Sequence, residues 1–496
     1  MVLVSLLFIA VLWAIFRGRR GQSVFYVLCA LAAVVLAMHI IFEGAHWQMI
    51  PAYLALLLAA LFVIPPMRTR RPRVAIMAAM LLLTAVTCGL SAVLPMFRLP
   101  RPTGPYAVGT RIDYLVDTSR LEDAAGHGHQ HRELMIQIWY PAKPSNNPIA
   151  PYRRRSETTL LSSYTAVLPT NSRWNAPVAD ALQAFPVLLF NPAWNGRRTQ
   201  NTYLTEELAS HGFVVAAIDH TYNSYPVAFP DGRVTGAASV PEMENVSKTT
   251  VDRLDAVLGR EVEKQAQDDI FVLNRLDAWD HDRSSPFFQR LDANNAGALG
   301  HSLGGSVAAL ACALDPRIKS TFDMSGPFYG RIQNLGLSKP FLLVDEGVAP
   351  HTRQELERLP PDQLTDAEED QEYLDQMNAS LKTYGGYWIV LHGANHASFT
   401  DHILTSPIGA WSGAGAIPNN EVLKFLRDYA VAFFELTLRH QSSPLLGDEK
   451  SPFPFATYTR YVPARKYAVA SVSSFGNRSP NSGEFGAAGA APAKSR

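Results

Sequence analysis

A Gly-His-Ser-Leu-Gly pentapeptide at residues 300–304 places Ser302 where a sharp turn could hold a nucleophile. An apolar run ends at Leu299 just before it, and an Ala-rich segment continues to Leu314. A serine on a turn between a strand and a helix needs small flanking residues, because larger ones would collide with both elements. The N-terminus of the helix also favours developing negative charge. The pattern predicts that Ser302 attacks a carbonyl carbon and carries an acyl group.

A serine hydroxyl needs a base to become a nucleophile, and histidine normally serves. In the hydrolases that carry G-x-S-x-G on such a turn, the acid and then the histidine follow the serine along the chain. The apolar run at residues 387–392 predicts the last strand, and His396 lies in the loop after it. We expect His396 to be the base, with His392 and His402 as the alternatives.

The elements that must position these residues are strands and helices in alternation, which begin at about residue 107. This order is typical of a mainly parallel sheet with helices on both faces. Residues 133–140 alternate apolar and polar types and predict a half-exposed strand. Residues 185–190 and 213–218 are continuous apolar runs, as in strands buried on both faces, and residues 201–211 between them predict a helix. Together with the serine turn, the order predicts the α/β-hydrolase fold.

The first hundred residues have a different composition. Residues 1–97 contain no Asp or Lys and a single Glu. The apolar runs at residues 24–42, 49–66 and 74–97 are close to the ~20 residues that cross a bilayer. A fourth run, residues 2–16, is shorter, and it lacks the positively charged start of a cleaved signal peptide. We predict a transmembrane region of about four helices in residues 1–100.

The arginines of this region predict its orientation. They gather at residues 17–20 and 68–73, whereas the loop at residues 43–48 has no Arg or Lys. Cytoplasmic loops collect Arg and Lys, so both arginine-rich loops are expected inside the cell. The chain after Phe97 then lies outside. The sequence predicts an integral membrane protein whose catalytic domain is on the non-cytoplasmic side.

The charge balance and the spacing of cysteines and histidines give no sign of a nucleic-acid partner or a metal site. Lys plus Arg and Asp plus Glu are equal at 44 each, so no basic field favours nucleic acid. The three cysteines lack metal-ligand or redox spacing. The histidine-rich residues 126–131 predict a solvated loop rather than a metal site. Residues 355–381, rich in Glu, Asp and Gln, predict an exposed helical insertion. We expect no metal, no cofactor and no nucleic-acid partner.

Four motifs together resemble the platelet-activating-factor acetylhydrolase family of plasma and intracellular (isoform II) lipases and its bacterial relatives. They are Gly-Pro-Tyr-Ala-Val-Gly at residues 104–109, Leu-Ala-Ser-His-Gly-Phe with the following strand at residues 208–217, the serine turn at residues 300–305, and the His-x-x-Phe-x-Asp sequence at residues 396–401. The likeness spans about residues 104–440. It does not extend to the apolar helices or the C-terminal tail.

The resemblance implies an ester hydrolase with Ser302 as nucleophile and His396 as base. It also implies an oxyanion hole made by two backbone N–H groups, those of Leu303 and Trp194. Trp194 stands where the family usually has a loop similar to Ser-His-Gly-Leu-Gly. The implied substrates are esters with short or oxidised acyl chains, including phospholipids. The apolar helices, and not the resemblance, predict the lipid bilayer as a partner.

The acid of the triad departs from the family pattern. An ungapped comparison places the family's aspartate at Ser325, whereas Asp323 lies two residues earlier. On a strand, a residue two positions away has the same face but lies about 6–7 Å lower. A bulge could bring it level. We expect Asp323 to be the acid, with Asp345 or Glu346, after the next predicted strand, as the alternatives.

The expected domain plan has three parts: transmembrane helices over residues 1–100, a catalytic domain over residues 104–445, and a C-terminal extension over residues 446–496. Residues 474–496 of this extension are mostly Gly, Ala, Ser and Pro and are expected to be disordered. Two other functions fit the same motifs. One is an acyltransferase that uses the same triad, and the other is an inactive hydrolase-like membrane protein that binds or regulates.

Overall fold

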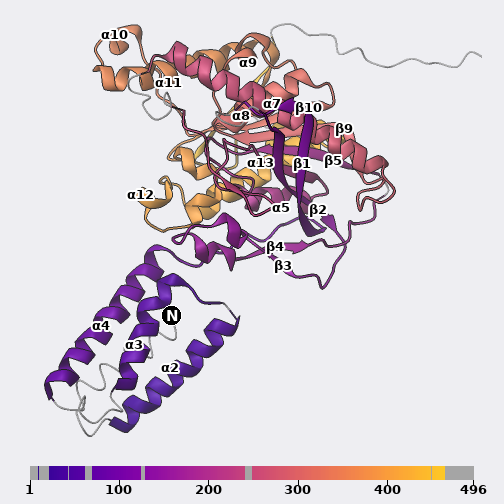
Figure 1. The fold of residues 1–496 in the computed structure, drawn as a ribbon. Coiled ribbons are helices and arrows are strands. Elements are labelled where there is room, and N and C mark those ends of the chain that lie inside the picture. The colour runs from indigo at the N-terminus through magenta and orange to yellow at the C-terminus, as the bar shows by residue number, and fades with distance from the viewer. Residues whose placement is uncertain are drawn as a thin grey trace, which may run out of the picture.

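A computed structural model describes residues 9, 22–42, 44–61, 70–123, 129–181, 183–240, 249–447 and 450–463. Several predictions lie outside the described residues, in whole or in large part. These concern the short apolar run at residues 2–16, the first arginine cluster, the start of the second, half of the histidine-rich loop and the tail from residue 464. Figure 1 shows two parts, a group of N-terminal helices and a larger α/β part from which those helices project.

The α/β part is built on an 11-stranded mixed sheet in the order β13-β12-β11-β10-β9-β5-β6-β2-β1-β4-β3. Strands β6, β5, β9, β10, β11 and β12 are parallel, whereas β2 runs antiparallel to β6 and β13 antiparallel to β12. The strands of this sheet are β1 Ala107–Leu121, β2 His131–Ala142, β3 Ile149–Pro151, β4 Pro169–Trp174, β5 Phe185–Asn191, β6 Val214–Asp219, β9 Leu291–His301, β10 Ile318–Met324, β11 Phe341–Asp345, β12 Gly386–Leu391 and β13 Ala456–Tyr461.

Helices cover both faces of the sheet and form two cores. Alternate side chains of β5 enter opposite cores: Val187 and Leu189 face one, Leu188 and Phe190 the other. The first core includes α7, α8 and α11, and the second includes α5 and α13. The helices are α5 Thr202–Ser210, α7 Val251–His281, α8 Leu303–Leu314, α9 Arg331–Leu335, α10 Arg353–Leu356, α11 Pro361–Tyr384, α12 Gly409–Ser412, α13 Asn419–Arg439 and α14 Pro444–Gly447.

This architecture confirms the predicted hydrolase-like α/β fold. Three of the predicted strands correspond to β2, β5 and β6, and the helix predicted between β5 and β6 is α5. The strand predicted at residues 387–392 corresponds to β12. The sequence did not predict β13, which adds an antiparallel edge strand beyond β12. The predicted helical insertion is largely α10 and α11, between β11 and β12.

The N-terminal part contains α2 (Gln22–Phe42), α3 (Ile50–Ala60) and α4 (Arg70–Val93), which pack on one another through a small apolar core of their own. Among the described residues, two helical segments are long and apolar enough to cross a membrane, 23–42 and 74–93. The described helix α3 has 11 residues, and the part of the predicted span at residues 49–66 from residue 62 onward lies outside the described residues. The structure therefore supports two of the four predicted spans by length and composition.

Candidate active site

Ser302 lies on a tight turn between β9 and α8, with φ of 56° and ψ of −129°. This left-handed φ is uncommon for a residue with a side chain. A Cβ on Gly300 would overlap the carbonyl of Gly304, and one on Gly304 would overlap the carbonyl of Asn191. The two glycines of the pentapeptide are therefore required by the close approach of strand, turn and helix. The turn has the geometry that the pentapeptide predicted.

Ser302 and His396 line one cavity of about 620 Å³. The size is within the roughly 300–1,000 Å³ typical of small-molecule sites. Residues from the ends of β5, β9, β10 and β11 and from α7 and α11 complete its walls; they include Trp194, Leu303, Ser325, Glu346, Leu258 and Tyr373. The fold thus brings together every predicted catalytic residue except Asp323.

The two predicted oxyanion donors come from different elements and line the same cavity. Leu303 is the first residue of α8, where backbone N–H groups have no partner inside the helix. Trp194 lies in the loop after β5. Asn191, which ends β5, is fully buried, and its side chain bonds to His220 and Asp269. These contacts fix the start of the loop that carries Trp194.

His396 begins a short 3₁₀ helix, His396–Phe399, just after β12. Its ring is half-exposed and faces two side chains with Nδ1: Glu346 Oε1 at 3.1 Å and Ser325 Oγ at 3.0 Å. The alternative His392 instead bonds with Nε2 to Thr457 on β13. Of His392, His396 and His402, it is His396 that lines the cavity.

Asp323 is fully buried below the cavity, where its Oδ1 accepts a hydrogen bond from the Gly326 N–H at 2.9 Å. Burial raises the pKa of this carboxyl well above its ordinary value. The register is regular here, because Asp323 pairs with Gly300 and Met324 with His301. No bulge lifts Asp323 to the level of the base, so the structure does not bring this predicted acid to His396. Ser325 stands there instead.

Asp345 and Glu346, the two alternative acids, are adjacent in the sequence but have different hydrogen-bond partners. Asp345 is buried, and its Oδ2 accepts from the Tyr373 hydroxyl at 2.5 Å and from Trp388 Nε1 at 2.8 Å. Burial raises its pKa to about 6. Burial by itself would raise the pKa of Glu346. The pKa is nevertheless below its ordinary value, because Glu346 accepts hydrogen bonds from His396 and Ser325 and interacts with the charge of His396. Glu346 is therefore the carboxylate that can stabilise a protonated His396.

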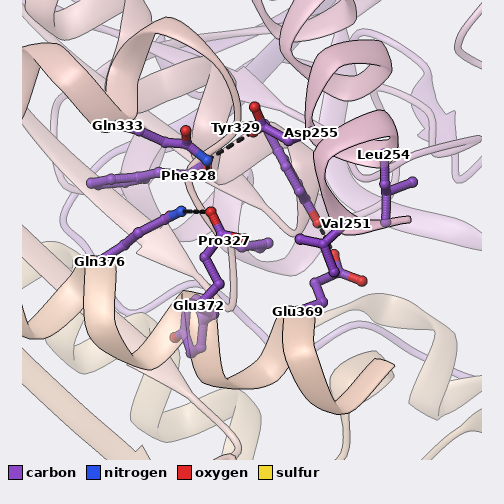
Figure 2. A pocket seen from close by; sticks show the side chains of 11 residues that line it. Val251, Leu254, Asp255, Pro327, Phe328, Tyr329, Gln333, Glu369, Glu372 and Gln376 are labelled. Atoms are coloured by element: carbon purple, nitrogen blue, oxygen red, sulfur yellow. Dashed lines mark hydrogen bonds between the residues drawn. The ribbon is translucent and has the colours of Figure 1, made fainter. Parts of the chain in front are cut away.

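Helix α11 closes one side of the cavity and is fastened to the domain behind it. Figure 2 shows a small pocket between α7, α9 and α11, where side chains from the three elements converge. The Tyr329 hydroxyl donates to Glu369 of α11, and Gln333 Nε2 donates to Asp255 of α7 at 2.7 Å. Tyr329 and Glu369 also line the larger cavity. Helix α11, the longer part of the acidic insertion, is thus a wall of the candidate site and is held to the loop after β10 by the Tyr329–Glu369 bond.

The sheet and the serine turn define a hydrolase of the α/β type. A solved structure, a ferulic acid esterase from Streptomyces cinnamoneus, is 28% identical in sequence, with a TM-score of 0.57. The likeness covers 73% of this chain and 99% of the esterase.

Comparisons of sequence show which family the chain is similar to. The family model for platelet-activating factor acetylhydrolase, isoform II, matches residues 92–330. A probable 1-alkyl-2-acetylglycerophosphocholine esterase from Arthroderma benhamiae is 24% identical over 403 residues, which are 73% of this chain and 94% of the relative. The platelet-activating factor acetylhydrolase of Canis lupus familiaris is 25% identical over 246 residues, 45% of this chain and 53% of the relative.

These findings confirm the resemblance that the motifs predicted, and they identify the chain as a carboxylic ester hydrolase. The matched range contains Ser302 and Trp194 but ends before Glu346 and His396. The assignment of the base and the acid therefore rests on the geometry of the site and not on the family model.

Proposed function

We propose that this protein hydrolyses carboxylic esters through an acyl-Ser302 intermediate, with His396 as base and Glu346 as acid. The observation that carries the proposal is the convergence of the three residues on one cavity, with Glu346 Oε1 3.1 Å from His396 Nδ1. Glu346 replaces Asp323 in this assignment, because the buried Asp323 bonds to the Gly326 N–H.

The reaction follows from the roles of these atoms. His396 Nε2 takes the hydroxyl proton of Ser302 as Oγ attacks the ester carbonyl carbon, and the N–H groups of Leu303 and Trp194 stabilise the resulting oxyanion. Glu346 holds Nδ1–H and stabilises the imidazolium. His396 then gives its proton to the leaving alcohol as the carbon–oxygen bond breaks. Water attacks the acyl-serine by the same route in reverse, which releases the acid and restores Ser302.

The proposed substrates are esters with short or oxidised acyl chains, such as phospholipid esters. The names of the fungal and canine relatives support this class. The proposal includes a membrane anchor in residues 1–100, supported by the two apolar helices, and a catalytic domain that begins at about residue 104. This domain extends past the predicted end at residue 445, because strand β13 at residues 456–461 belongs to the same sheet. An anchor would hold the cavity near lipid esters.

A fluorophosphonate probe tests the mechanism. We expect the full-length protein in detergent to be labelled, and Ser302→Ala to lose both labelling and the hydrolysis of p-nitrophenyl acetate. Absence of label on the folded wild type would favour the inactive binding or regulatory protein. Product analysis with added alcohol or lysolipid separates hydrolysis from acyl transfer. A panel of p-nitrophenyl esters of increasing chain length would define the acyl preference.

The anchor and its orientation are tested separately. We expect the protein to stay with membranes after carbonate extraction. A reporter active only in the cytoplasm and fused near residue 105 should be silent if the catalytic domain is on the non-cytoplasmic side. An active reporter would reverse the orientation, and release of the protein by carbonate would contradict the anchor.

A further inference from the structure

A chain of side-chain hydrogen bonds connects the loop after β5 with the loop after β12. Gln200 Oε1 accepts from the Ala193 N–H at 3.1 Å, and Gln200 Nε2 lies 2.7 Å from His301 Nδ1. His301 Nε2 lies 2.9 Å from the backbone carbonyl of His396. Ala193 directly precedes the proposed oxyanion donor Trp194, so the chain joins the two catalytic loops.

The donors and acceptors of this chain fit one arrangement. The carbonyl of His396 can only accept, so His301 Nε2 must carry a proton. In a neutral imidazole Nδ1 is then an acceptor, and it accepts from the Gln200 amide NH₂. The Gln200 oxygen is left for the Ala193 N–H, whereas the flipped amide would set two donors against each other. Every group in the chain is therefore satisfied when His301 is neutral.

The surroundings of His301 keep it neutral and close to the base. Its side chain is almost fully buried, and burial followed by the charge of His396 lowers its pKa to about 3. Its ring centroid lies 4.6 Å from that of His396 and 5.9 Å from that of Phe399. His301 thus contacts the loop of the base through a hydrogen bond and through packing.

We propose that Gln200 and His301 are positioning residues that hold the oxyanion loop and the catalytic base in register. Neither side chain lines the cavity, so both act through Ala193 and His396. This inference rests on the proposed roles of Ser302 and His396. Loss of these hydrogen bonds should lower kcat more than it changes KM. A catalytic group misplaced by ~1 Å costs about a hundredfold in rate, while the contacts with the substrate remain.

Three substitutions of His301 separate its two bonds. His301→Gln can place an N–H near the position of Nε2 and keep the bond to the His396 carbonyl. His301→Asn can place an oxygen near Nδ1 and keep the bond to Gln200, and His301→Phe keeps the packing without either bond. With p-nitrophenyl acetate and full-length protein, we expect kcat to fall about tenfold in His301→Gln and about a hundredfold in the other two, with KM within about twofold.

A double-mutant cycle tests whether the chain acts as one unit. Gln200→Leu should lower kcat by about tenfold, and adding it to His301→Phe should lower kcat little further, because residues of one network are not additive. His392→Asn is the matched control and should keep the wild-type kcat. If the His301 variants do not fold, Gln200→Leu alone must still show a lower kcat with unchanged KM and melting temperature.

The outcomes distinguish this inference from the proposed function. If Ser302→Ala keeps wild-type turnover, the proposed function fails. If Ser302→Ala is inactive but Gln200→Leu and the three His301 variants keep the wild-type kcat, the positioning chain alone is refuted. Fully additive losses, or losses of kcat that follow the melting temperatures instead of the order of the bonds, would also refute it.

Discussion

The ends of β10 and β11 are neighbours at the same edge of the sheet, yet they give the base different partners. Ser325 follows β10 and Glu346 follows β11, and each places an oxygen about as close to His396 Nδ1, at 3.0 Å and 3.1 Å. A carboxylate can stabilise the imidazolium that forms during catalysis, whereas a hydroxyl contributes only a neutral hydrogen bond. The proposed acid is therefore set by its distance from the base, and residues at two adjacent strand ends lie within hydrogen-bond distance of His396.

Asp323 and Asp345, whose carboxyl groups lie just before these strand ends, do not face the base. Asp323 on β10 packs under the serine turn, and Asp345 on β11 receives the Tyr373 hydroxyl and Trp388 Nε1. Burial raises the pKa of both groups, so a charge on either one is disfavoured. Asp345 connects the end of β11 to α11 and β12, and Asp323 bonds to Gly326 in the turn after β10, while Glu346 and Ser325 face the base.

The largest effect should come from removing the charge at the end of β11. We expect Glu346→Gln to lower kcat/KM about 10²–10⁴-fold, because the imidazolium of His396 loses its stabilising carboxylate. The measurement is steady-state hydrolysis of p-nitrophenyl acetate at pH 7.5, with exposed Glu357→Gln as a control of unchanged activity. An active Glu346→Gln together with an inactive Asp323→Asn would return the acid to β10.

The next effect moves the acid between the two strand ends. In the Glu346→Gln background, we expect Ser325→Asp to restore about tenfold of the lost kcat/KM, since Ser325 already faces Nδ1 and can hold a charge there. The φ of 58° at Ser325 is tolerated by Asp better than by most residues. Ser325→Asn in the same background is the neutral control. Equal activity of the two double variants would show that this strand end cannot carry the acid.

Ser325→Ala in the wild-type background should have a smaller effect. It removes a neutral hydrogen bond to the His396–Glu346 pair, which is worth about 0.5–1.5 kcal/mol, and kcat should fall by about two- to tenfold. Pre-steady-state labelling by a fluorophosphonate measures the reactivity of Ser302 directly. A loss as large as that of Glu346→Gln would mean that the hydroxyl, and not the carboxylate, is the principal partner of the base.

The smallest effect concerns stability and pH. The pKa of Asp345 rises from 3.8 to about 6 on folding. A group whose pKa is raised contributes stability that is complete below its unfolded value and is lost as the pH rises through the folded value. Between about pH 4 and pH 7 the melting temperature of the wild type should therefore fall relative to that of Asp345→Asn. A constant difference across this range would show that Asp345 titrates normally.

Much of the fold and half of the site could be predicted from local patterns. The continuous apolar runs of β5 and β6 require burial on both faces, and their alternating side chains enter two cores. The glycines around Ser302 permit the turn in which the structure holds it. His396 follows the strand at which the chain order places a base. These features depend on neighbours in sequence, so the sequence carries them.

The membrane region was predicted from hydropathy alone. Apolar length predicted four spans; two of them correspond to the described helical segments at residues 23–42 and 74–93, whereas the runs at residues 2–16 and 49–66 lie largely or partly outside the described residues. Hydropathy measures how long a segment can remain apolar. It does not say where a helix begins and ends, which depends on the caps and on packing against its neighbours.

The assignment of Glu346 as the proposed acid and the bonds of His301 depend on tertiary structure. Asp323 was expected to reach the base through a bulge, but β9 and β10 stay in regular register around it. Glu346 reaches His396 because β11 lies beside β10 and ends near the loop that carries His396. The side chain of glutamate is also longer than that of aspartate. The sequence by itself determined which residues carry groups that could act as nucleophile, base or acid. The pairing of strands that are far apart in the sequence determined which of these side chains lie in contact, because contact between two strand ends is a property of the sheet.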